Sequence, residues 1–479
     1  MGTLGGSPNP PATGLGEQRS PAPHAIRPVS ADDNRRICDR QQRRAFTFAA
    51  AAHGLHKGAG MRTAFPTVLL VVAALAWSRP ARALQPLEEF VRGARAHNPV
   101  NDAARAEHAA ADARAGETLG RALPAISAVG TTSRNQWQVI VGGATFVPLN
   151  QVDGTVAVTV PLLDLTRFVR VSAANRLADS AGYRQQEVAR AAEAETVQLY
   201  YQLAADLGLV RAARRALEVV EVNLAMTEQT ARAGTATALD VQRAAAEVER
   251  QRQQLTSAEL EVTLAARALE SRTRVVADTH MEPQLGDDLH TEPPLAEFLA
   301  NAPLTPMVKS AALAREAAER TATAQALMLL PALIGSASER YTNATAFLGG
   351  HNEAYTLALS LVWAFDLGTP AGIRARNAEA TAAAAREREA ALVIGDAIFR
   401  AWSTIEADIA RCRSARAQAA VSARAAEIAR ARYHSGVASQ LDLIQADRDA
   451  FAAEAGRIQS DADLLNARLQ LRLAAGQAM

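Results

Sequence analysis

Two short patterns with chemical meaning occur 202 residues apart in this chain of 479 residues. In each, a glycine is followed by a hydroxyl residue and then an aspartate: Gly234, Thr237 and Asp240, and again Gly436, Ser439 and Asp442. A Thr or Ser three residues before an acidic residue is typical of a capped helix start, and glycine permits the left-handed turn that ends the preceding helix. Asp240 and Asp442 therefore have two possible roles, a helix cap and a functional charge.

Signatures of catalysis and metal binding do not accompany these patterns. The sequence has no G-x-S-x-G, Walker, H-E-x-x-H or C-x-x-C motif, so it does not indicate an enzyme. Its histidines are scattered. His280 and His290 flank an acidic segment with Asp287 and Asp288, but ten residues of loop impose no ligand geometry. We interpret this segment as a solvated linker and predict neither a metal site nor a cofactor.

The elements around the two patterns also occur twice. Residues 86–90 (PLEEF) return as 294–298 (PLAEF), and Leu123-Pro124 returns as Leu330-Pro331. Self-similarity at one spacing indicates a duplicated architecture. We therefore expect a first structural repeat at 84–277, a linker at 278–294 and a second structural repeat at 295–479.

Each repeat is expected to open with a helix that ends at its Leu-Pro pair, because proline cannot continue a helix. Alternating apolar residues follow, Val156-Val158-Val160 and Leu357-Leu359-Leu361. With the extended stretches before them they predict two β-hairpins, four strands in all, at about 124–164 and 331–366. The turns are expected at Gly142-Gly143 and Gly349-Gly350. Aromatic residues lie where a membrane barrel carries its girdles: Trp137, Phe146, Tyr341, Phe347, Tyr355, Trp363 and Phe365.

Two very long helices are predicted next, from about Thr166 to Ala231 and from about Thr369 to Arg432, each on the order of 100 Å long. Leu203, Val210, Leu217 and Leu224 are seven residues apart, as in a coiled-coil seam. Ile405 and Cys412 occupy the equivalent places in the second repeat. Cys412 is therefore expected to be a buried, unreactive seam residue rather than a redox or metal thiol. Return helices at about 239–277 and 441–475 complete two helical hairpins.

Composition agrees with this fold class, mainly α with a small β part. Aromatic residues make up only 4% of the chain while alanine and arginine dominate, which suits long, closely packed helices. Residues 61–83 read as a signal peptide, with an apolar run and Ala81-Arg82-Ala83 as the cleavage site. We expect Met61 to be the true start, Leu84 the mature N-terminus and residues 1–60 a mis-assigned leader. A disordered extension on a membrane-tethered protein is the alternative.

The mature chain is expected to be mildly acidic. Removing residues 1–83 leaves 40 Lys and Arg against 46 Asp and Glu, a net charge of −6, so nucleic acid is not the expected partner. No later stretch has 18 consecutive apolar residues, so only β-strands would cross a membrane. Four strands do not close a barrel, so two, three or four copies would have to contribute 8, 12 or 16 strands.

The ordered set of features resembles the TolC-type outer-membrane efflux protein family over residues 86–476. The features are the signal peptide, the duplicated helix-hairpin-helix order, Asn98-Pro99, the Leu-Pro pairs and the two Gly-x4-Leu-Asp tips. The resemblance implies a homotrimer with a 12-stranded β-barrel in the outer membrane and a 12-helix tunnel in the periplasm. It implies a passive exit duct, in a tripartite efflux pump or a type I secretion system, with a periplasmic adaptor protein and an inner-membrane transporter as partners.

The resemblance also assigns roles to residues at the tips. Family members contact the adaptor at turns that correspond to Ala233-Gly234-Thr235 and Ser435-Gly436-Val437. Tyr433 and Asp442 match the tyrosine and the first aspartate of the family's periplasmic gate, whereas Ala438 and Gln445 replace its arginine and second aspartate. We therefore expect a periplasmic constriction at Asp442, Gln445 and Tyr433, with Thr237, Asp240 and Ser439 as helix caps.

A periplasmic coiled-coil scaffold or adaptor without a channel is the alternative interpretation. It explains the signal peptide and the heptads, but it gives the four alternating strands no role. The transported substrate, whether a drug, a metal ion or a polypeptide, is not indicated by any motif.

Overall fold

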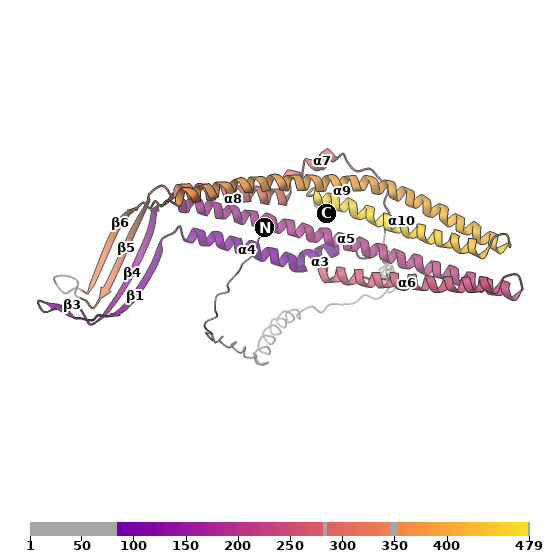
Figure 1. Cartoon of the computed structure of the whole chain (residues 1–479), viewed down its shortest axis with the longest axis horizontal. Helices are drawn as coiled ribbons and strands as arrows, with labels where there is room; N and C mark the ends of the chain where they lie inside the picture. Colours follow the sequence, from indigo (N-terminus) through magenta and orange to yellow (C-terminus); the bar gives the residue numbers. More distant parts are fainter. Residues whose placement is uncertain (1–83, 281–284, 345–351, 478–479) are drawn as a thin grey trace, which may run out of the picture. The chain divides into compact units, whose positions relative to one another are not determined.

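The structure is a computed structural model that describes residues 84–280, 285–344 and 352–477. These residues belong to one compact unit, Arg79–Met479, whose helices and strands are shown in Figure 1. The predicted leader and signal peptide and the expected Gly349-Gly350 turn lie outside the described residues.

Each repeat opens with helices that a proline interrupts. In the first repeat, α3 (Leu87–His97) and α4 (Pro99–Gly120) are separated by Asn98, whose side chain caps α4 by accepting from the Val100 N–H (3.1 Å). In the second, α7 (Leu295–Leu299), a short 3-10 helix (Ala302–Leu304) and α8 (Pro306–Leu327) take the corresponding place. Proline at the first helical position costs no hydrogen bond, so Pro99 and Pro306 can begin α4 and α8.

The strands form a four-stranded antiparallel sheet in the order β1-β4-β5-β6, with bounds Ala125–Arg134, Asn150–Leu163, Ala332–Thr342 and Glu353–Val362. The prediction of four strands in all is wrong within the described residues. The first hairpin is extended by a separate two-stranded piece, β2 (Val139–Val141) with β3 (Ala144–Val147), which turns at Gly142-Gly143. A register shift between Val139 and Ile140 breaks the alternation there, so the sequence pattern did not reveal it.

Four helices form two long hairpins, α5 (Leu165–Arg232) with α6 (Ala238–Thr273) and α9 (Thr369–His434) with α10 (Gln440–Ala474). These bounds confirm the predicted long helices, and 68 residues in α5 correspond to about 100 Å. Helix α6 ends a few residues earlier than expected, because Arg274 adopts a left-handed conformation (φ 56°) as its C-cap. The hairpins also contact each other through α5 and α10.

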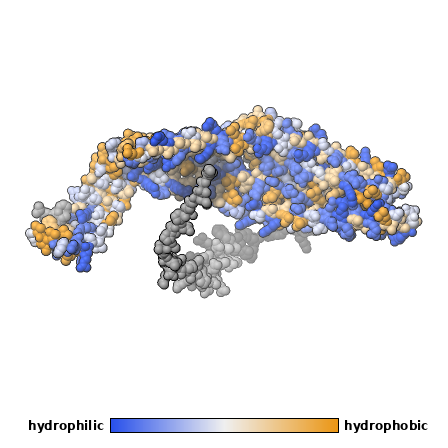
Figure 2. All heavy atoms as spheres, viewed as in Figure 1, coloured by the Kyte–Doolittle hydropathy of each residue, from blue (hydrophilic) through white to orange (hydrophobic). Residues whose placement is uncertain are grey.

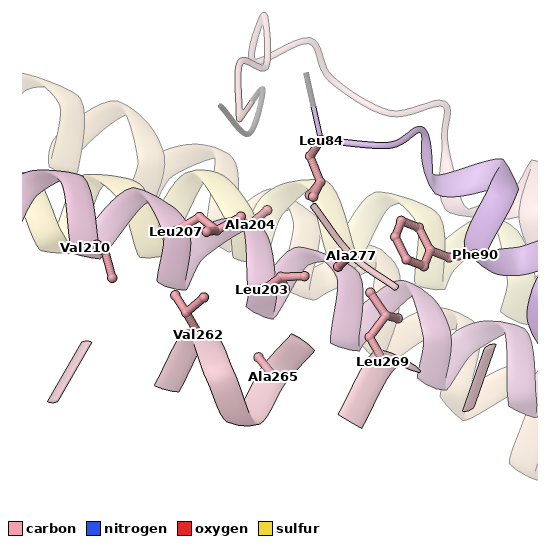
Figure 3. Close-up of a cluster of buried hydrophobic side chains, with 10 residues drawn as sticks. All are labelled: Leu84, Phe90, Leu203, Ala204, Leu207, Val210, Val262, Ala265, Leu269 and Ala277. Atoms are coloured by element: carbon pink, nitrogen blue, oxygen red, sulfur yellow. The ribbon is translucent and has the colours of Figure 1, made fainter. Parts of the chain in front are cut away.

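The hydrophobic cores of the two repeats use equivalent positions. In the first repeat, Leu84, α3, α5 and α6 contribute to one cluster that includes Phe90, Leu203, Val210, Val262 and Leu269 (Figure 3). In the second repeat, the corresponding residues Phe298, Ile405, Cys412, Leu464 and Leu471 form the matching cluster. The duplication inferred from the sequence therefore extends to the packing of the interior.

The predicted heptad seam is confirmed only in part. Leu203, Leu207 and Val210 are buried, but Leu217 and Leu224 are half-buried while the neighbouring Val220 is buried. Helix α5 also packs against α10 through a cluster of Ala205, Ala212, Ile458 and Ala462. Because α5 packs against both α6 and α10 along this stretch, its buried residues do not follow the single heptad repeat that the sequence suggested.

The prediction of a solvated linker between the repeats is confirmed only in part, because most of its described residues are exposed but two of its carboxylates are buried. Asp287 and Glu292 both pair with Arg468 of α10, and all three side chains are at most 7% exposed. Arg416 of α9 donates to the Asp287 carbonyl oxygen (2.8 Å), and the Trp402 indole donates to the Pro293 carbonyl oxygen (2.9 Å). Arg468 carries the charge that these carboxylates need when buried, and its partners lie far away in the sequence.

Hydrophilic side chains cover much of the helical part in the view of Figure 2, with hydrophobic ones scattered among them. Among the helices of the described residues, none has the length and the apolar character needed to cross a membrane.

Candidate functional sites: the helical tips and the two-faced sheet

Both helical hairpins turn through the same hydrogen-bonded motif. Gly234 (φ 78°) and Gly436 (φ 72°) are in the left-handed region. At the second tip the Gly436 N–H donates to the Tyr433 carbonyl oxygen (3.0 Å) and the Val437 N–H to that of Arg432 (2.9 Å), and the first tip repeats both bonds. This is the Schellman motif, which satisfies the last carbonyl groups of a helix. The predicted glycine turns are therefore confirmed.

Both return helices begin with a complete capping box. Ser439 Oγ accepts from the Asp442 N–H (3.2 Å), and Asp442 Oδ2 accepts from the Ser439 N–H (3.0 Å). Thr237 and Asp240 make the same two bonds, at 3.2 and 3.1 Å. The cap roles predicted for Thr237, Asp240 and Ser439 are confirmed, and the structure shows that Asp442 is a cap as well.

The two cap aspartates are ionised and differ in exposure. Hydrogen bonds from the Ser439 backbone and hydroxyl hold the pKa of Asp442 below its usual value, with Arg432 adding a smaller effect. The Thr237 hydroxyl and backbone lower the pKa of Asp240 in the same way. Asp442 is exposed whereas Asp240 is half-buried. Of the two cap aspartates, Asp442 is therefore the one whose negative charge is fully exposed to solvent.

The other predicted constriction residues have partners within the chain. Tyr433 is half-buried, and its hydroxyl lies 3.2 Å from Thr227 Oγ1 of α5. Gln445 is exposed and donates to Asp449 Oδ1 one turn along α10 (2.9 Å). The structure thus brings Asp442 and Gln445 to the start of α10, while Tyr433 lies on the end of α9 and contacts the first repeat.

The turns predicted to contact the adaptor are exposed. Ala233, Gly234 and Thr235, and likewise Ser435, Gly436 and Val437, all lie on the surface. Val437 is 67% exposed and Leu441 beside it 58%, so the second tip presents apolar side chains to solvent. Exposed apolar residues at a tip rimmed by polar ones are typical of a contact surface.

Two buried carboxylates near the tips connect the two repeats, and no sequence pattern predicted these contacts. Asp447 of α10 accepts from Asn223 of α5 (2.8 Å) and from Arg430 of α9 (3.1 Å). Burial raises the pKa of Asp447, and Arg430 opposes that effect. The contact with Asn223 joins positions 224 residues apart, for which no periodic pattern exists.

Glu247 of α6 makes the second connection. Its side chain is 2% exposed and pairs with Arg448 of α10 (2.6 Å) and with Arg250 on its own helix. Burial alone would raise the pKa of Glu247, but hydrogen bonds from Arg250 and Arg448 outweigh burial and lower it. A buried carboxylate shared by two guanidinium groups holds α6 and α10 together close to the tips.

Among the described residues, the ligand atoms of Asp287, Asp288 and His290 lie within 4.8 Å of one another, as metal ligands would. Arg468 occupies this cluster: it pairs with Asp287, and its Nη1 is 3.0 Å from His290 Nε2. A guanidinium group at this position already neutralises the carboxylate and repels a cation. The arrangement is explained as an ion-pair network that fixes the linker.

The four-stranded sheet has one apolar and one polar face, as follows from its register and the alternation of side chains. The apolar face carries Ile126, Ala128, Val156, Val158, Val160, Leu333, Gly335, Ala337, Tyr355, Leu357, Leu359 and Leu361, and its charged residues, Arg134, Glu339 and Glu353, lie toward the end of the sheet away from the helices. The polar face carries Ser127, Thr131, Ser133, Asp153, Thr155, Thr159, Ser336, Ser338, Arg340, Thr356 and Ser360, together with the apolar Val129, Ile334 and Val362. Leu357, Leu359 and Leu361 are 67% to 74% exposed. A sheet that leaves such a row uncovered is suited to an apolar surrounding.

The ends and edges of the sheet show how it connects to the rest of the chain. Ala125 pairs with Thr159, and Ala332 pairs with Val362. The connections of the sheet to α4, α5, α8 and α9 therefore all lie at one end of the sheet. Strands β1 and β6 pair on one side only and are the sheet edges. These edges run in opposite directions, so the antiparallel pattern would continue if copies were joined edge to edge.

The family comparison agrees with this architecture in both repeats. Residues 91–273 and 298–477 match the model of the outer membrane efflux protein family. The chain belongs to this family. Outer membrane efflux proteins are channels rather than enzymes, so membership gives the coarse function, efflux through a channel of the outer membrane, and the place where it occurs.

Solved structures share the fold of this outer membrane efflux protein. The outer-membrane channel OprN is 22% identical, with a TM-score of 0.71 over 82% of this chain and 90% of its own. The outer membrane protein VceC of Vibrio cholerae is 18% identical, with a TM-score of 0.70 over 82% of this chain and 96% of its own. The CmeC outer membrane channel of Campylobacter jejuni is 16% identical, with a TM-score of 0.70 over 88% and 94%. A comparison with curated proteins finds no match.

Proposed function

We propose that three copies of the chain assemble into the outer-membrane exit duct of a tripartite efflux pump or a type I secretion system. Their strands form one 12-stranded barrel, and their helical hairpins form a 12-helix tunnel in the periplasm. The duct is passive, and an inner-membrane transporter and a periplasmic adaptor protein supply the substrate. A drug, a metal ion and a polypeptide all remain candidate substrates.

The sheet is the observation that carries this proposal. A strand edge cannot face lipid unpaired, because its N–H and C=O groups would lack partners. Edges β1 and β6 run in opposite directions, so one copy can pair with the next and close the ring. In the closed barrel the apolar face meets lipid and the polar face lines the channel, which is the alternation of membrane barrels. The four helices that adjoin the sheet, α4, α5, α8 and α9, all leave from one end of it, as a duct with a single periplasmic side requires.

The tips support the assignment of a periplasmic docking and constriction region. Rotational symmetry brings one Asp442 from every copy to the same ring, and a ring of like charges favours cations. Gln445, which has no charge, adds no second charged ring, and Tyr433 completes the proposed constriction, with its hydroxyl 3.2 Å from Thr227 Oγ1 of the same copy. The exposed turns at Gly234 and Gly436 would meet the adaptor.

Two measurements test the proposal, one on membrane fractions and one on purified protein. The protein should appear in outer-membrane fractions as a heat-modifiable oligomer with the mass of three chains, and it should form channels in planar bilayers. The periplasmic scaffold without a channel predicts a soluble periplasmic protein and no conductance. Recovery of the protein only in the soluble periplasmic fraction would overturn the proposed duct.

Variants at the tips then test the roles of individual residues. Asp442→Ala should weaken the cation preference and raise the conductance, whereas Asp240→Ala, in the matching cap of the first repeat, should mainly affect stability. If Asp442→Ala leaves selectivity and conductance at the wild-type level, the residue is a helix cap only. Gly436→Val should abolish transport with barrel and trimer intact, and unchanged efflux would place the docking surface elsewhere.

A further inference from the structure

The polar face of the sheet carries one ion pair. Arg340 of β5 donates through Nη2 (2.6 Å) and Nε (3.1 Å) to Oδ1 of Asp153 on β4. Asp153 and Arg340 are the only charged side chains on this face among the residues of β1, β4, β5 and β6. The rest of the face consists of hydroxyl and small side chains, the amide of Gln151, and the apolar Val129, Ile334 and Val362.

The pair is held in place by neighbours but remains in contact with solvent. Gln151 donates to the second oxygen of Asp153 (2.6 Å), and Asn135 donates to Gln151 Oε1 (3.3 Å). The Arg340 side chain is 49% exposed and that of Asp153 is 19% exposed. The guanidinium group is therefore free to act on ions that pass this face, although its charge is compensated by the carboxylate.

Glu339, the residue before Arg340, provides a contrast. Successive side chains in a strand point to opposite faces, and Glu339 pairs in register with Val156 and Tyr355 of the apolar face. Two charged residues that are adjacent in the sequence thus lie on opposite sides of the sheet. Only one of them can reach the interior of a barrel made from this sheet.

We infer that the Asp153–Arg340 pair is a charge-balanced selectivity element of the channel interior, where it keeps the barrel section from preferring either sign of ion. The inference rests on the proposed function, because the polar face must line the channel. Three copies would place three carboxylates and three guanidinium groups around the interior. Rings of charged side chains determine the sign of the ions that a pore admits, and here each ring cancels the other.

Removal of one partner should therefore change selectivity in a direction set by the partner that remains. Asp153→Asn leaves three positive charges and should favour anions, whereas Arg340→Gln leaves three negative charges and should favour cations. For an ion about 10 Å from each charge in 0.1 M salt, screened Coulomb energies change its local concentration about twofold, and the cation-to-anion ratio roughly fourfold. Exposed ion pairs contribute little to stability, so both variants should fold and assemble.

The test is the reversal potential of single channels in planar bilayers under a salt gradient. The two single variants should shift the permeability ratio in opposite directions, and the double variant should return it toward wild type. Arg340→Lys keeps the charge and should keep the ratio. Glu339→Gln is the matched control, because it removes a charge next to Arg340 on the other face, and it should leave the ratio unchanged.

Several outcomes would overturn the inference. If both single variants shift the ratio in the same direction, or neither shifts it while conductance remains, the pair only stabilises the sheet. An equal effect of Glu339→Gln would also contradict it, because the response would not depend on the polar face. If the wild-type protein forms no channels at all, the proposed function is wrong and the inference fails with it.

Discussion

The substitution Gly436→Ala adds one methyl group and should destabilise the turn at the second tip. The φ of Gly436, 72°, lies in the left-handed region, and no atom lies within 4 Å of the position that a Cβ would take. A steric conflict with neighbours is therefore absent, and the cost of Gly436→Ala is that of the left-handed backbone alone. That cost is about 1–2 kcal/mol for a residue with a Cβ.

The consequence should be confined to the tip. The turn is held by the Val437 and Ala438 N–H groups, which both donate to the Arg432 carbonyl oxygen (2.9 and 3.2 Å). If the closed turn loses 1–2 kcal/mol, local opening becomes roughly 5 to 30 times more frequent, since 1.4 kcal/mol is a factor of ten. Amide hydrogen exchange in a peptide that covers residues 430–440 should accelerate by that factor.

Gly456 of the same helix hairpin offers a matched control. It lies inside α10, is exposed and also has nothing within 4 Å of a built Cβ. Because alanine is preferred over glycine inside a helix by about 0.5–1 kcal/mol, Gly456→Ala should leave tip exchange unchanged and slightly stabilise α10. If Gly436→Ala does not accelerate exchange at the tip, or if both variants accelerate it equally, the left-handed glycine does not determine the stability of the turn.

Three further predictions concern the interior and the start of the chain. Burial and the nearby Asp461 raise the pKa of Cys412 to about 11, so its thiol should react with a thiol reagent only after unfolding, and rapid labelling of native protein would contradict the packing shown. The folded state holds the pKa of Glu247 below its value in the unfolded chain. The ionised pair therefore stabilises the fold at pH values above the unfolded pKa, by about 1–2 kcal/mol with partly exposed partners. This stabilisation should be lost as the pH falls through the folded pKa. Glu247→Gln should therefore lower the unfolding midpoint at pH 7 more than at pH 4, and an equal loss at both would exclude the ionised pair. The intact mass of protein purified from membranes should match a chain that begins at Leu84, and recovery of residues 1–60 would refute the start at Met61.

Local motifs explain what the sequence made predictable. The turns at Gly234 and Gly436 and the caps at Asp240 and Asp442 depend on residues within one helical turn, so their spacing is visible in the chain. Strand faces are likewise local, because alternation in β4 and β6 assigns each side chain to a face without knowledge of the partner strand.

Contacts between segments that are distant in the sequence could not be predicted from sequence patterns. Arg468 meets Asp287 at a separation of 181 residues, Arg448 meets Glu247 at 201, and Arg340 meets Asp153 at 187. No periodicity links such partners, since each depends on the register of strands or the rotation of packed helices. The linker prediction missed the burial of Asp287 and Glu292 for this reason: the two carboxylates were visible in the sequence, but their partner Arg468 was not.

Disulfide cross-linking between β1 and β6 tests whether strands of neighbouring copies pair edge to edge in one barrel. In a Cys412→Ser background, a cysteine replaces Ser127 of β1 together with one of Thr356, Ala358 or Ser360 of β6, all on the polar face. Oxidation of membranes should yield covalent dimers and trimers for at least one pair. A cysteine at Ser338 of the inner strand β5, in place of the β6 cysteine, should yield none. Monomers alone for every pair, or ladders that extend beyond three chains, would contradict the closed three-copy barrel.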